Sequence, residues 1–554
     1  MSSCTESFVL FRTSMLGRPF HGLALATVIS SLASLPTSSA TAQTVLSQLR
    51  VEVRDQADGP LIPARIYLMD DKGAHWTADG LITYVKGREH HFVSPGSFQI
   101  KLPAGKYTLR VERGPEYVPW SSLIQMEESK DRKENILLHR WIRMNQLGWY
   151  SGDLHNHRPA EQMPALLLSE DLNLAPTLAD WIWEDHPVSQ PPKTSDAIRK
   201  VDDSHVFSVL DKEVERLENG PGAVDLLGLK SPISFQGYRL YPPNDTYCRA
   251  AHAQGGYVDA EKILWRDAAA LAALQQIDFA GIVYNHFNPH GIDSETEKWG
   301  MIPKDRAEFN TVAGMPLWAM EVYYRFLNCG FHLPVSAGSA SAVKEAPLGY
   351  NRVYVKLHRP FSYNNWFQAL KSGHSFATNG PMLFLTVNGV EPGHTLLLSR
   401  PQPSRLSIHA EALSAGGLDR LEILFKGRLI KSVSNPEPSQ KLVADFESLA
   451  SETGWVVTRC FEKPAATIRF AHTSPVYIQF GRESGVVAAD ARFFIEWIDR
   501  EIRFYQEQSG FREDSDRSEM VSFFQKARAV YVKISGGEGK PAKSQDKARA
   551  ERLR

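Results

Sequence analysis

Apolar and polar residues alternate in short runs between residues 48 and 138. This period of two is the pattern of strands with one buried face, and turn-forming segments such as Asp58-Gly59-Pro60 separate the runs. The runs cover residues 49–53, 64–69, 97–102 and 107–111. We therefore predict a small antiparallel β-sandwich over residues 43–145.

Between residues 149 and 379, short apolar runs alternate with helix-like segments. The runs at residues 277–284 and 317–323 predict strands, and residues 260–275 predict a helix. Strands that alternate with helices are typical of a parallel sheet or barrel. We place the boundaries of this domain at residues 146–380.

The alternating pattern returns after Pro381 and predicts a second β-sandwich over residues 381–485. Apolar residues then recur at helical spacing, which predicts C-terminal helices over residues 486–535, packed on that sandwich. Residues 536–554 are rich in Lys, Arg and Gly. They predict a solvated, disordered tail.

The composition is that of a packed globular protein, with 43% hydrophobic and 10% aromatic residues among 554. The 62 Lys and Arg residues and the 63 Asp and Glu residues almost cancel. The chain therefore lacks the broad positive field with which proteins bind phosphate backbones. We do not expect nucleic acid as a partner.

The N-terminal segment has the successive zones of a secretory signal peptide. Arg12 and Arg18 precede an apolar run at residues 22–29, and small residues follow at positions 38–42. The apolar run is short for a bilayer span, and an uncleaved anchor or a buried helix is the alternative. We expect a signal peptide over residues 1–42, export to the periplasm or the cell exterior, and no stable membrane insertion after cleavage.

The segment Gly152-Asp153-Leu154-His155-Asn156-His157 carries the clearest chemistry. Side chains two apart on an extended chain point to the same side, so His155 and His157 project together. Two neutral imidazoles suit a divalent ion such as zinc, manganese or iron, and Asp153 is placed to fix the tautomer of one imidazole. The four cysteines are scattered, so His and carboxylate groups must hold such an ion. Histidines in an exposed turn are the alternative.

Two distant residues are further candidates for this site. His286 ends the apolar run 279–284, where a barrel strand would deliver side chains to a site. Glu213 is placed either to complete the ligand set or to act as general base. A loop histidine and a solvated charge are the respective alternatives. Weaker candidates, whose alternatives are surface charge or a buried hydrogen bond, are Glu184, Asp185, His186, Glu215, His252, Asp259, Glu261 and Glu321.

Other catalytic classes have little support in the sequence. It contains no GxSxG nucleophile motif, no GxxxxGK[ST] phosphate loop and no HExxH helix. Segments 103–107 and 113–117 resemble carboxypeptidase-regulatory-like sandwiches, which are usually accessory modules of secreted enzymes.

Four segments together resemble the CehA/McbA family of metallohydrolases, part of the polymerase and histidinol phosphatase (PHP) superfamily: residues 148–157, 323–331, 349–355 and 375–381. The resemblance implies a distorted (β/α) barrel with one to three divalent ions, which hydrolyses phosphoesters or, in the name-giving members, a carbamate ester. His155 and His157 match the family's first metal motif. Glu213 falls where its bridging carboxylate is expected, and His286 lies near a later ligand strand.

Two departures from the family pattern reduce the expected ligand set. The family's Asp-x-His pair is missing, because Gly338-Ser339 runs into Ala340-Ser341-Ala342, and Asp225 is the one side chain offered where a histidine is expected. We therefore expect one or two ions. The leading hypothesis is a secreted metal-dependent hydrolase acting on phosphoester, carboxylic or carbamate ester bonds of a small-molecule or polymer substrate. The alternative is a non-catalytic binding protein with a degenerate PHP barrel.

Overall fold

The computed structural model describes residues 45–293, 302, 304–399 and 403–536. Strands dominate it and are arranged in several sheets around three hydrophobic cores. The predicted signal peptide and residues 537–554 of the predicted tail lie outside the described residues. No helix among the described residues is long and apolar enough to cross a membrane.

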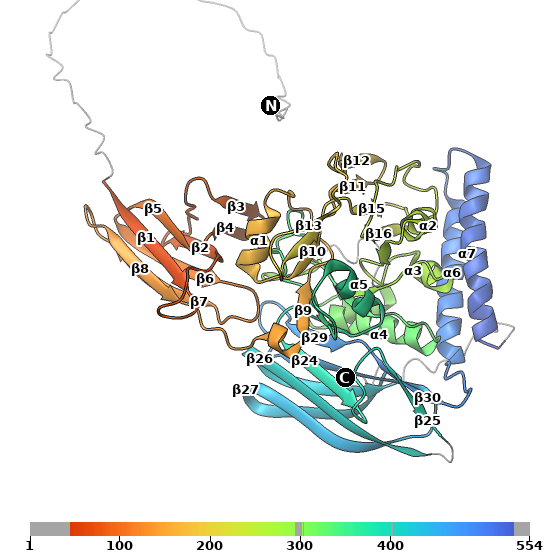
Figure 1. The fold of residues 1–554 in the computed structure, drawn as a ribbon. Helices are drawn as coiled ribbons and strands as arrows, with labels where there is room; N and C mark the ends of the chain where they lie inside the picture. Colours follow the sequence, from red (N-terminus) through yellow and green to blue (C-terminus); the bar gives the residue numbers. More distant parts are fainter. Residues whose placement is uncertain (1–44, 294–301, 303, 400–402, 537–554) are drawn as a thin grey trace, which may run out of the picture. The chain divides into compact units, whose positions relative to one another are not determined.

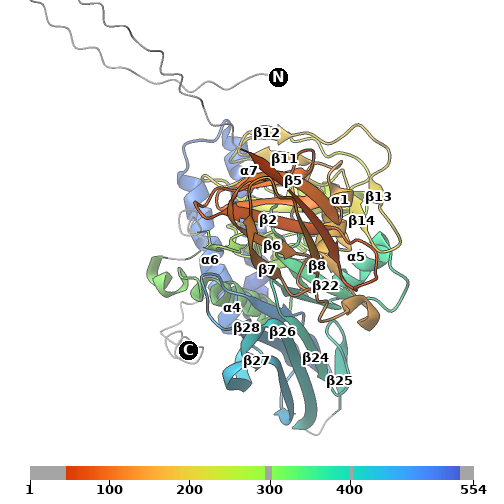
Figure 2. The same cartoon turned by 90° about the vertical axis from the view of Figure 1, so that its left-hand side faces the viewer.

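The N-terminal region forms two sheets that share one core (Figure 2). One sheet has the order β5-β1-β8 and the other the order β3-β4-β2-β6-β7. The strands predicted from alternation are confirmed, because their buried positions recur every second residue. The strands are β1 (Leu46–Arg54), β2 (Ala64–Asp70), β3 (Ile82–Lys86), β4 (Glu89–Ser94), β5 (Ser97–Pro103), β6 (Gly105–Glu112), β7 (Trp120–Met126) and β8 (Arg132–Leu137).

The central region mixes short strands with helices (Figure 1). Its strands are β9 (Trp149–Gly152), β10 (Leu174–Pro176), β11 (Asp180–Trp183), β12 (His186–Ser189), β13 (Ile198–Lys200), β14 (Val206–Ser208), β15 (Lys212–Arg216), β16 (Gly222–Leu227), β17 (Tyr257–Asp259), β18 (Ala280–Val283), β19 (Phe287–Asn288), β20 (Gly291–Ile292), β21 (Val335–Ala337), β22 (Arg352–Lys356) and β23 (Ser375–Thr378). Its helices are η1 (Met144–Leu147), α1 (Met163–Glu170), α2 (Asp245–Ala253), α3 (Ala268–Ala273), η3 (Lys304–Phe309), α4 (Gly314–Asn328) and α5 (Tyr363–Lys371).

Backbone hydrogen bonds connect the strands that surround the histidine segment. β15 pairs in parallel with β11 and antiparallel with β16, and β16 pairs with β17. A parallel bridge from Asp259 to Phe279 joins the end of β17 to the chain before β18, and β18 pairs with β21. Leu154 N–H then donates to Ala337 O at 3.0 Å, and Leu178 N–H donates to Asn156 O at 2.9 Å. The segment with His155 and His157 therefore lies between β21 and the chain that leads into β11.

Two predicted elements of this region are wrong. Residues 317–323 belong to helix α4, and almost every residue of that helix is buried. An element buried on all sides shows no periodicity from which helix and strand can be told apart. The predicted helix 260–275 is reduced to α3, because Glu261 has a left-handed φ of 57° that interrupts a helix and leaves a loop before it.

The strands after residue 381 continue the sheet of the central region. β23 pairs antiparallel with β29, so a 13-stranded sheet runs from β13 through β9 and β22 into the C-terminal part. Trp149 and Phe376 from the central region lie in the core of these strands. The strands are β24 (Met382–Val387), β25 (Thr395–Leu398), β26 (Ser404–Phe425), β27 (Arg428–Ala450), β28 (Gly454–Glu462), β29 (Phe470–Thr473) and β30 (Val476–Phe480).

The two predicted C-terminal helices are confirmed, as α6 (Ala488–Glu507) and α7 (Asp514–Ile534). Their predicted position on the C-terminal strands is wrong, because they pack against α3 and α4 (Figure 1). Trp497 Nε1 donates to Arg266 O at 3.0 Å, and Tyr531 Oη donates to Ala269 O at 2.9 Å. The short, alanine-rich α3 leaves room for these large aromatic side chains.

Candidate metal centre

His155, His157 and Glu213 meet in the central region. One donor atom from each lies within 4.8 Å of the other two. The two Nε2 atoms are 3.0 Å apart, and Glu213 lies 3.6 Å from His155 Nε2 and 3.0 Å from His157 Nε2. The three side chains are no more than 7% exposed. The structure thus brings together three of the four ligands predicted from the sequence.

Asp153 holds the backbone on which the histidines stand. It is fully buried, and its carboxylate accepts N–H groups from His155 at 3.2 Å, Ser339 at 3.0 Å and Gly349 at 2.7 Å. Burial raises its pKa, although these hydrogen bonds oppose the rise. The expectation that Asp153 fixes an imidazole tautomer is therefore corrected, because its oxygens bind backbone N–H groups instead.

The strand pairing places three carboxyl groups in one row. Glu213 on β15 is paired with Asp225 on β16, and Asp225 with Asp259 on β17. Directly paired residues project from the same face of a sheet. Asp225 Oδ2 lies 3.4 Å from His155 Nδ1, and Glu261 Oε1, in the loop after β17, lies 3.3 Å from it. His155 therefore faces Glu213 with one ring nitrogen and two further carboxyl groups with the other.

Sequence analysis named Glu261 only as a weaker candidate and Asp225 only as the side chain offered where a histidine is expected, and the structure places both beside His155. Asn219-Gly220 signals a hairpin between β15 and β16, and Asn219 adopts a left-handed φ of 62°, but a two-residue turn there would pair residue 213 with residue 226. The observed hairpin instead closes with Arg216 paired to Gly222 around residues 217–221, and this longer loop sets the register that pairs residue 213 with residue 225. Glu261 gave no comparable signal, because its position depends on the loop after β17.

The electrostatics of the centre follow from burying opposite charges together. Burial disfavours ionisation of Glu213, yet the charge of His155 and the closeness of both imidazoles hold its pKa well below the ordinary value. Burial likewise lowers the pKa of His155, but Asp225 and Glu213 outweigh it and the net pKa is raised. Burial raises the pKa of Asp225, and it raises that of Asp259 to about 6. Without a further cation, the carboxyl groups of Glu213, Asp225 and Asp259 outnumber the imidazole of His155 that can carry a compensating positive charge.

The donor set fits a divalent ion. Ligand distances of about 2.0–2.1 Å in tetrahedral geometry place donor atoms about 3.3 Å apart. The two Nε2 atoms are 3.0 Å apart, and each has a different oxygen of Glu213 at 3.0 or 3.6 Å. Both oxygens of Glu213 and both of Asp225 are buried without a hydrogen-bond partner. Such groups are rare in folded proteins and are often explained by an ion or water.

His286, the fourth predicted ligand, is not part of this group. It is buried at the end of β18, where Phe287 N–H donates to Tyr284 O at 3.0 Å and turns the chain. Burial and the charges of Lys262 and Lys344 lower its pKa. The turn changes the direction in which the strand delivers its side chains, which the apolar run alone does not reveal.

Most of the weaker candidates have structural partners elsewhere. Glu184 accepts backbone N–H groups of residues 217 and 218, each at 3.0 Å. His252 pairs with Asp278 at 2.8 Å, and Glu321 with Arg325 at 2.9 Å. His186 is exposed. Asp185 accepts the N–H of residue 239.

The segment of small residues at 338–342 lies directly against the histidine segment. Ala340 N–H donates to His155 O at 2.7 Å, and His157 N–H donates to Ser341 O at 2.9 Å. A side chain at Gly338 would meet His155 Cβ at 2.4 Å. This segment therefore supports the histidine backbone closely but supplies no metal-ligating side chain.

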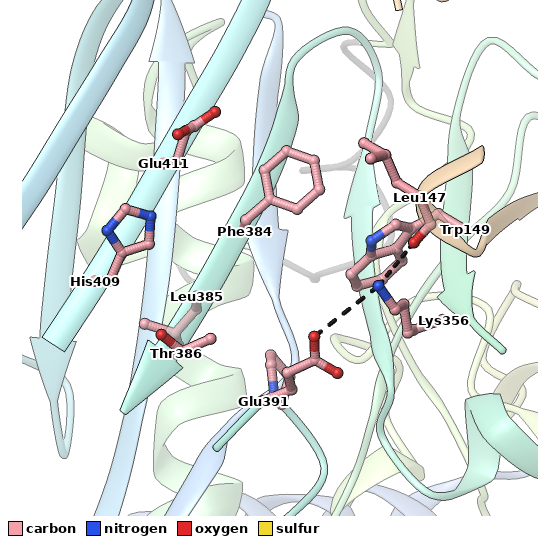
Figure 3. A pocket seen from close by; sticks show the side chains of 10 residues that line it. Leu147, Trp149, Lys356, Phe384, Leu385, Thr386, Glu391, His409 and Glu411 are labelled. Carbon is pink, nitrogen blue, oxygen red and sulfur yellow. Dashed lines mark hydrogen bonds and ion pairs between the residues drawn. The ribbon is translucent and has the colours of Figure 1, made fainter. Parts of the chain in front are cut away.

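A cavity of about 290 Å³ lies apart from the metal-ligand residues. Figure 3 shows Phe384 on one side of it and Trp149 and Lys356 on the other. Lys356 Nζ donates to Leu147 O at 2.7 Å and lies 4.0 Å from Glu391. None of the three metal-ligand candidates lines this cavity.

No protein-family model matches the sequence, and no curated protein matches it. Among solved structures, the chain is similar over a fifth of its length to the Bacillus anthracis TIE protein, with 19% identity, 19% of that chain covered and a TM-score of 0.14. It is also similar to a streptococcal ancillary pilin, with 15% identity over 21% of this chain and 37% of that chain, and a TM-score of 0.15. These matches span well under half of either protein, and the low scores carry no argument about the function of this chain.

Proposed function

We propose that this chain is an exported, metal-dependent hydrolase of ester bonds, in which His155, His157 and Glu213 hold a divalent ion. The observation that carries the proposal is the convergence of donors from His155, His157 and Glu213, together with the oxygens of Glu213 and Asp225, which are buried without a hydrogen-bond partner. Zinc, manganese and iron are the ions that suit this mixture of imidazole and carboxylate.

A distorted barrel of the PHP kind is part of the proposal. It is supported by the continuous path of backbone hydrogen bonds from β11 through β15, β16, β17, β18 and β21 to the histidine segment and back toward β11. Active sites of barrels lie at the carboxyl ends of their strands. Segment 153–157 directly follows β9, which agrees with such a position.

The side chains of this centre have separate tasks. His155 Nδ1 lies beside two carboxyl groups, which favours a proton on that nitrogen and leaves the Nε2 lone pair for an ion. Both oxygens of Glu213 are free of hydrogen bonds, so one can serve as a ligand while the other accepts a proton as general base. A divalent ion held there would lower the pKa of a bound water toward neutrality and would polarise the phosphoryl or carbonyl oxygen of an ester.

Elemental analysis of the purified protein tests the proposal first. We expect stoichiometric zinc, manganese or iron, and we expect the double variant His155→Ala, His157→Ala to lose both the metal and metal-dependent turnover of phosphomonoester, phosphodiester or carboxylic ester substrates. His186→Ala is the matched control, because His186 is exposed and does not belong to the triad. Wild-type protein that is free of metal and equally active with or without added ions would refute the proposal.

A binding protein with a degenerate centre is the second candidate. It is favoured by the segment at 338–342, which lies against the histidines but carries Ala340 and Ala342 where the resembled family has its last ligand pair. Stoichiometric metal without turnover of any ester in the panel would support this alternative.

A further inference from the structure

A buried lysine lies next to the metal-ligand triad. Lys262 is 1% exposed and follows Glu261 in the loop between β17 and α3. Its Nζ forms an ion pair with Glu261 Oε1, and the same oxygen lies 3.3 Å from His155 Nδ1. One carboxylate oxygen therefore lies between the side-chain nitrogen of Lys262 and an imidazole of the triad.

The carboxylate of Glu261 is fully engaged by donors of this chain. Besides Lys262, Oε1 accepts Asn285 Nδ2 at 3.0 Å, and Oε2 accepts Trp265 Nε1 at 2.6 Å. Lys262 Nζ also lies 4.8 Å from the centre of the Trp265 ring, so the two side chains hold each other. This contrasts with Glu213 and Asp225, whose oxygens have no hydrogen-bond partner. Glu261 is therefore not available as a ligand for an additional ion.

Five buried carboxyl groups lie at or beside the triad, and their negative charges need compensating cations. Within the part of the chain that the structure describes, Lys262 is the only lysine or arginine that forms an ion pair with any of the buried carboxyl groups here. Burying carboxylates without compensating positive charge is costly. The five groups are Glu213, Glu215, Asp225, Asp259 and Glu261.

We infer that the centre binds a single divalent ion and that the ammonium group of Lys262 takes the place of a second one. The ion compensates the negative charge of Glu213, and the ammonium group of Lys262 compensates that of Glu261. This inference rests on the proposed function, because it assumes that the triad holds an ion. The inference reduces the expected number of bound ions from one or two to one. It depends on Lys262, which the sequence analysis did not single out.

The experiment is a zinc titration of the folded, full-length protein, followed by elemental analysis after removal of free zinc. We expect one zinc ion per chain in the wild type and in Lys262→Arg, which keeps the positive charge. We expect Lys262→Met to bind two, because Glu261 then becomes available together with Asp225. Glu261→Gln should still bind one, since Glu261 is not a ligand.

Lys212→Met is the matched control. Lys212 is also 1% exposed and lies next to Glu213, but its ammonium pairs with Asp180 at 2.8 Å instead of the cluster. We expect it to bind one zinc ion. Two ions in the wild type, one ion in a folded Lys262→Met, or loss of zinc in Glu261→Gln would each overturn the inference. If Lys262→Met does not fold, the wild-type and Glu261→Gln counts still decide it. Wild-type protein that binds no zinc would instead overturn the proposed function itself.

Discussion

Replacing Asp153 with asparagine tests whether the backbone of the histidine segment sets the metal affinity. The carboxylate of Asp153 accepts three backbone N–H groups, from His155, Ser339 and Gly349. An amide keeps one acceptor oxygen and presents an NH₂ group, so at least one of these N–H groups loses its partner inside the protein. The segment that carries His155 and His157 is then held less firmly.

The size of the effect follows from two opposing contributions. A buried hydrogen-bonding group left without a partner costs about 1–3 kcal/mol. Burial raises the pKa of Asp153, so the ionised carboxylate carries a desolvation cost that an amide avoids, which offsets part of that loss. We expect the free energy of unfolding of metal-free Asp153→Asn to fall by about 1–3 kcal/mol. Metal affinity should fall about 10- to 100-fold, as is typical when a group that orients a ligand is changed.

The assay combines urea denaturation of the metal-free protein with a chelator competition titration for metal affinity. Asp267→Asn is the control, because Asp267 is also fully buried and its pKa is also raised by burial, but its partner is Asn244 at 2.9 Å. The control should change stability and leave metal affinity unaltered. Equal metal affinity in Asp153→Asn and wild type would refute the reasoning, because the histidine geometry would then not depend on Asp153.

Three further predictions concern the rest of the molecule. In metal-free protein the pKa of His155 is raised, and metal binding requires the neutral imidazole. Metal affinity should therefore increase as the pH rises toward and through that raised pKa. Competition titrations that show no pH dependence would contradict this. Arg65→Met should lower the free energy of unfolding, measured by urea denaturation, by about 3–5 kcal/mol, because buried Glu170, 2.5 Å away, loses the arginine with which it pairs. A decrease of less than about 1 kcal/mol would count against a tight ion pair. Tyr84→Phe should cost about 1–2 kcal/mol and speed hydrogen exchange at the Ala342 N–H, which donates to Tyr84 Oη at 3.2 Å. Unchanged exchange at that amide would show that Tyr84 does not hold the loop.

The parts of the site that could be predicted from sequence are those fixed by local geometry. His155 and His157 are two residues apart on an extended segment, so their convergence follows from the alternation of side chains. His286 was predicted by the same strand-end argument, but the turn after Val283 removed it from the group. The contact between His155 and Glu261 depends on the loop between β17 and α3, which was itself mistaken for helix. Side-chain placement across such loops is a tertiary property that no local pattern encodes.

The N-terminal β-region is tied to the centre more closely than an accessory module would be. The Tyr84 hydroxyl donates to Lys344 O and accepts Ala342 N–H, and the segment at 338–342 that it steadies lies against the backbone of both histidines. Glu89 of β4 pairs with His290 at 3.1 Å, shortly after His286 in the chain. Because a metal centre tolerates only small displacements of its ligands, these contacts make the N-terminal strands part of what positions His155 and His157.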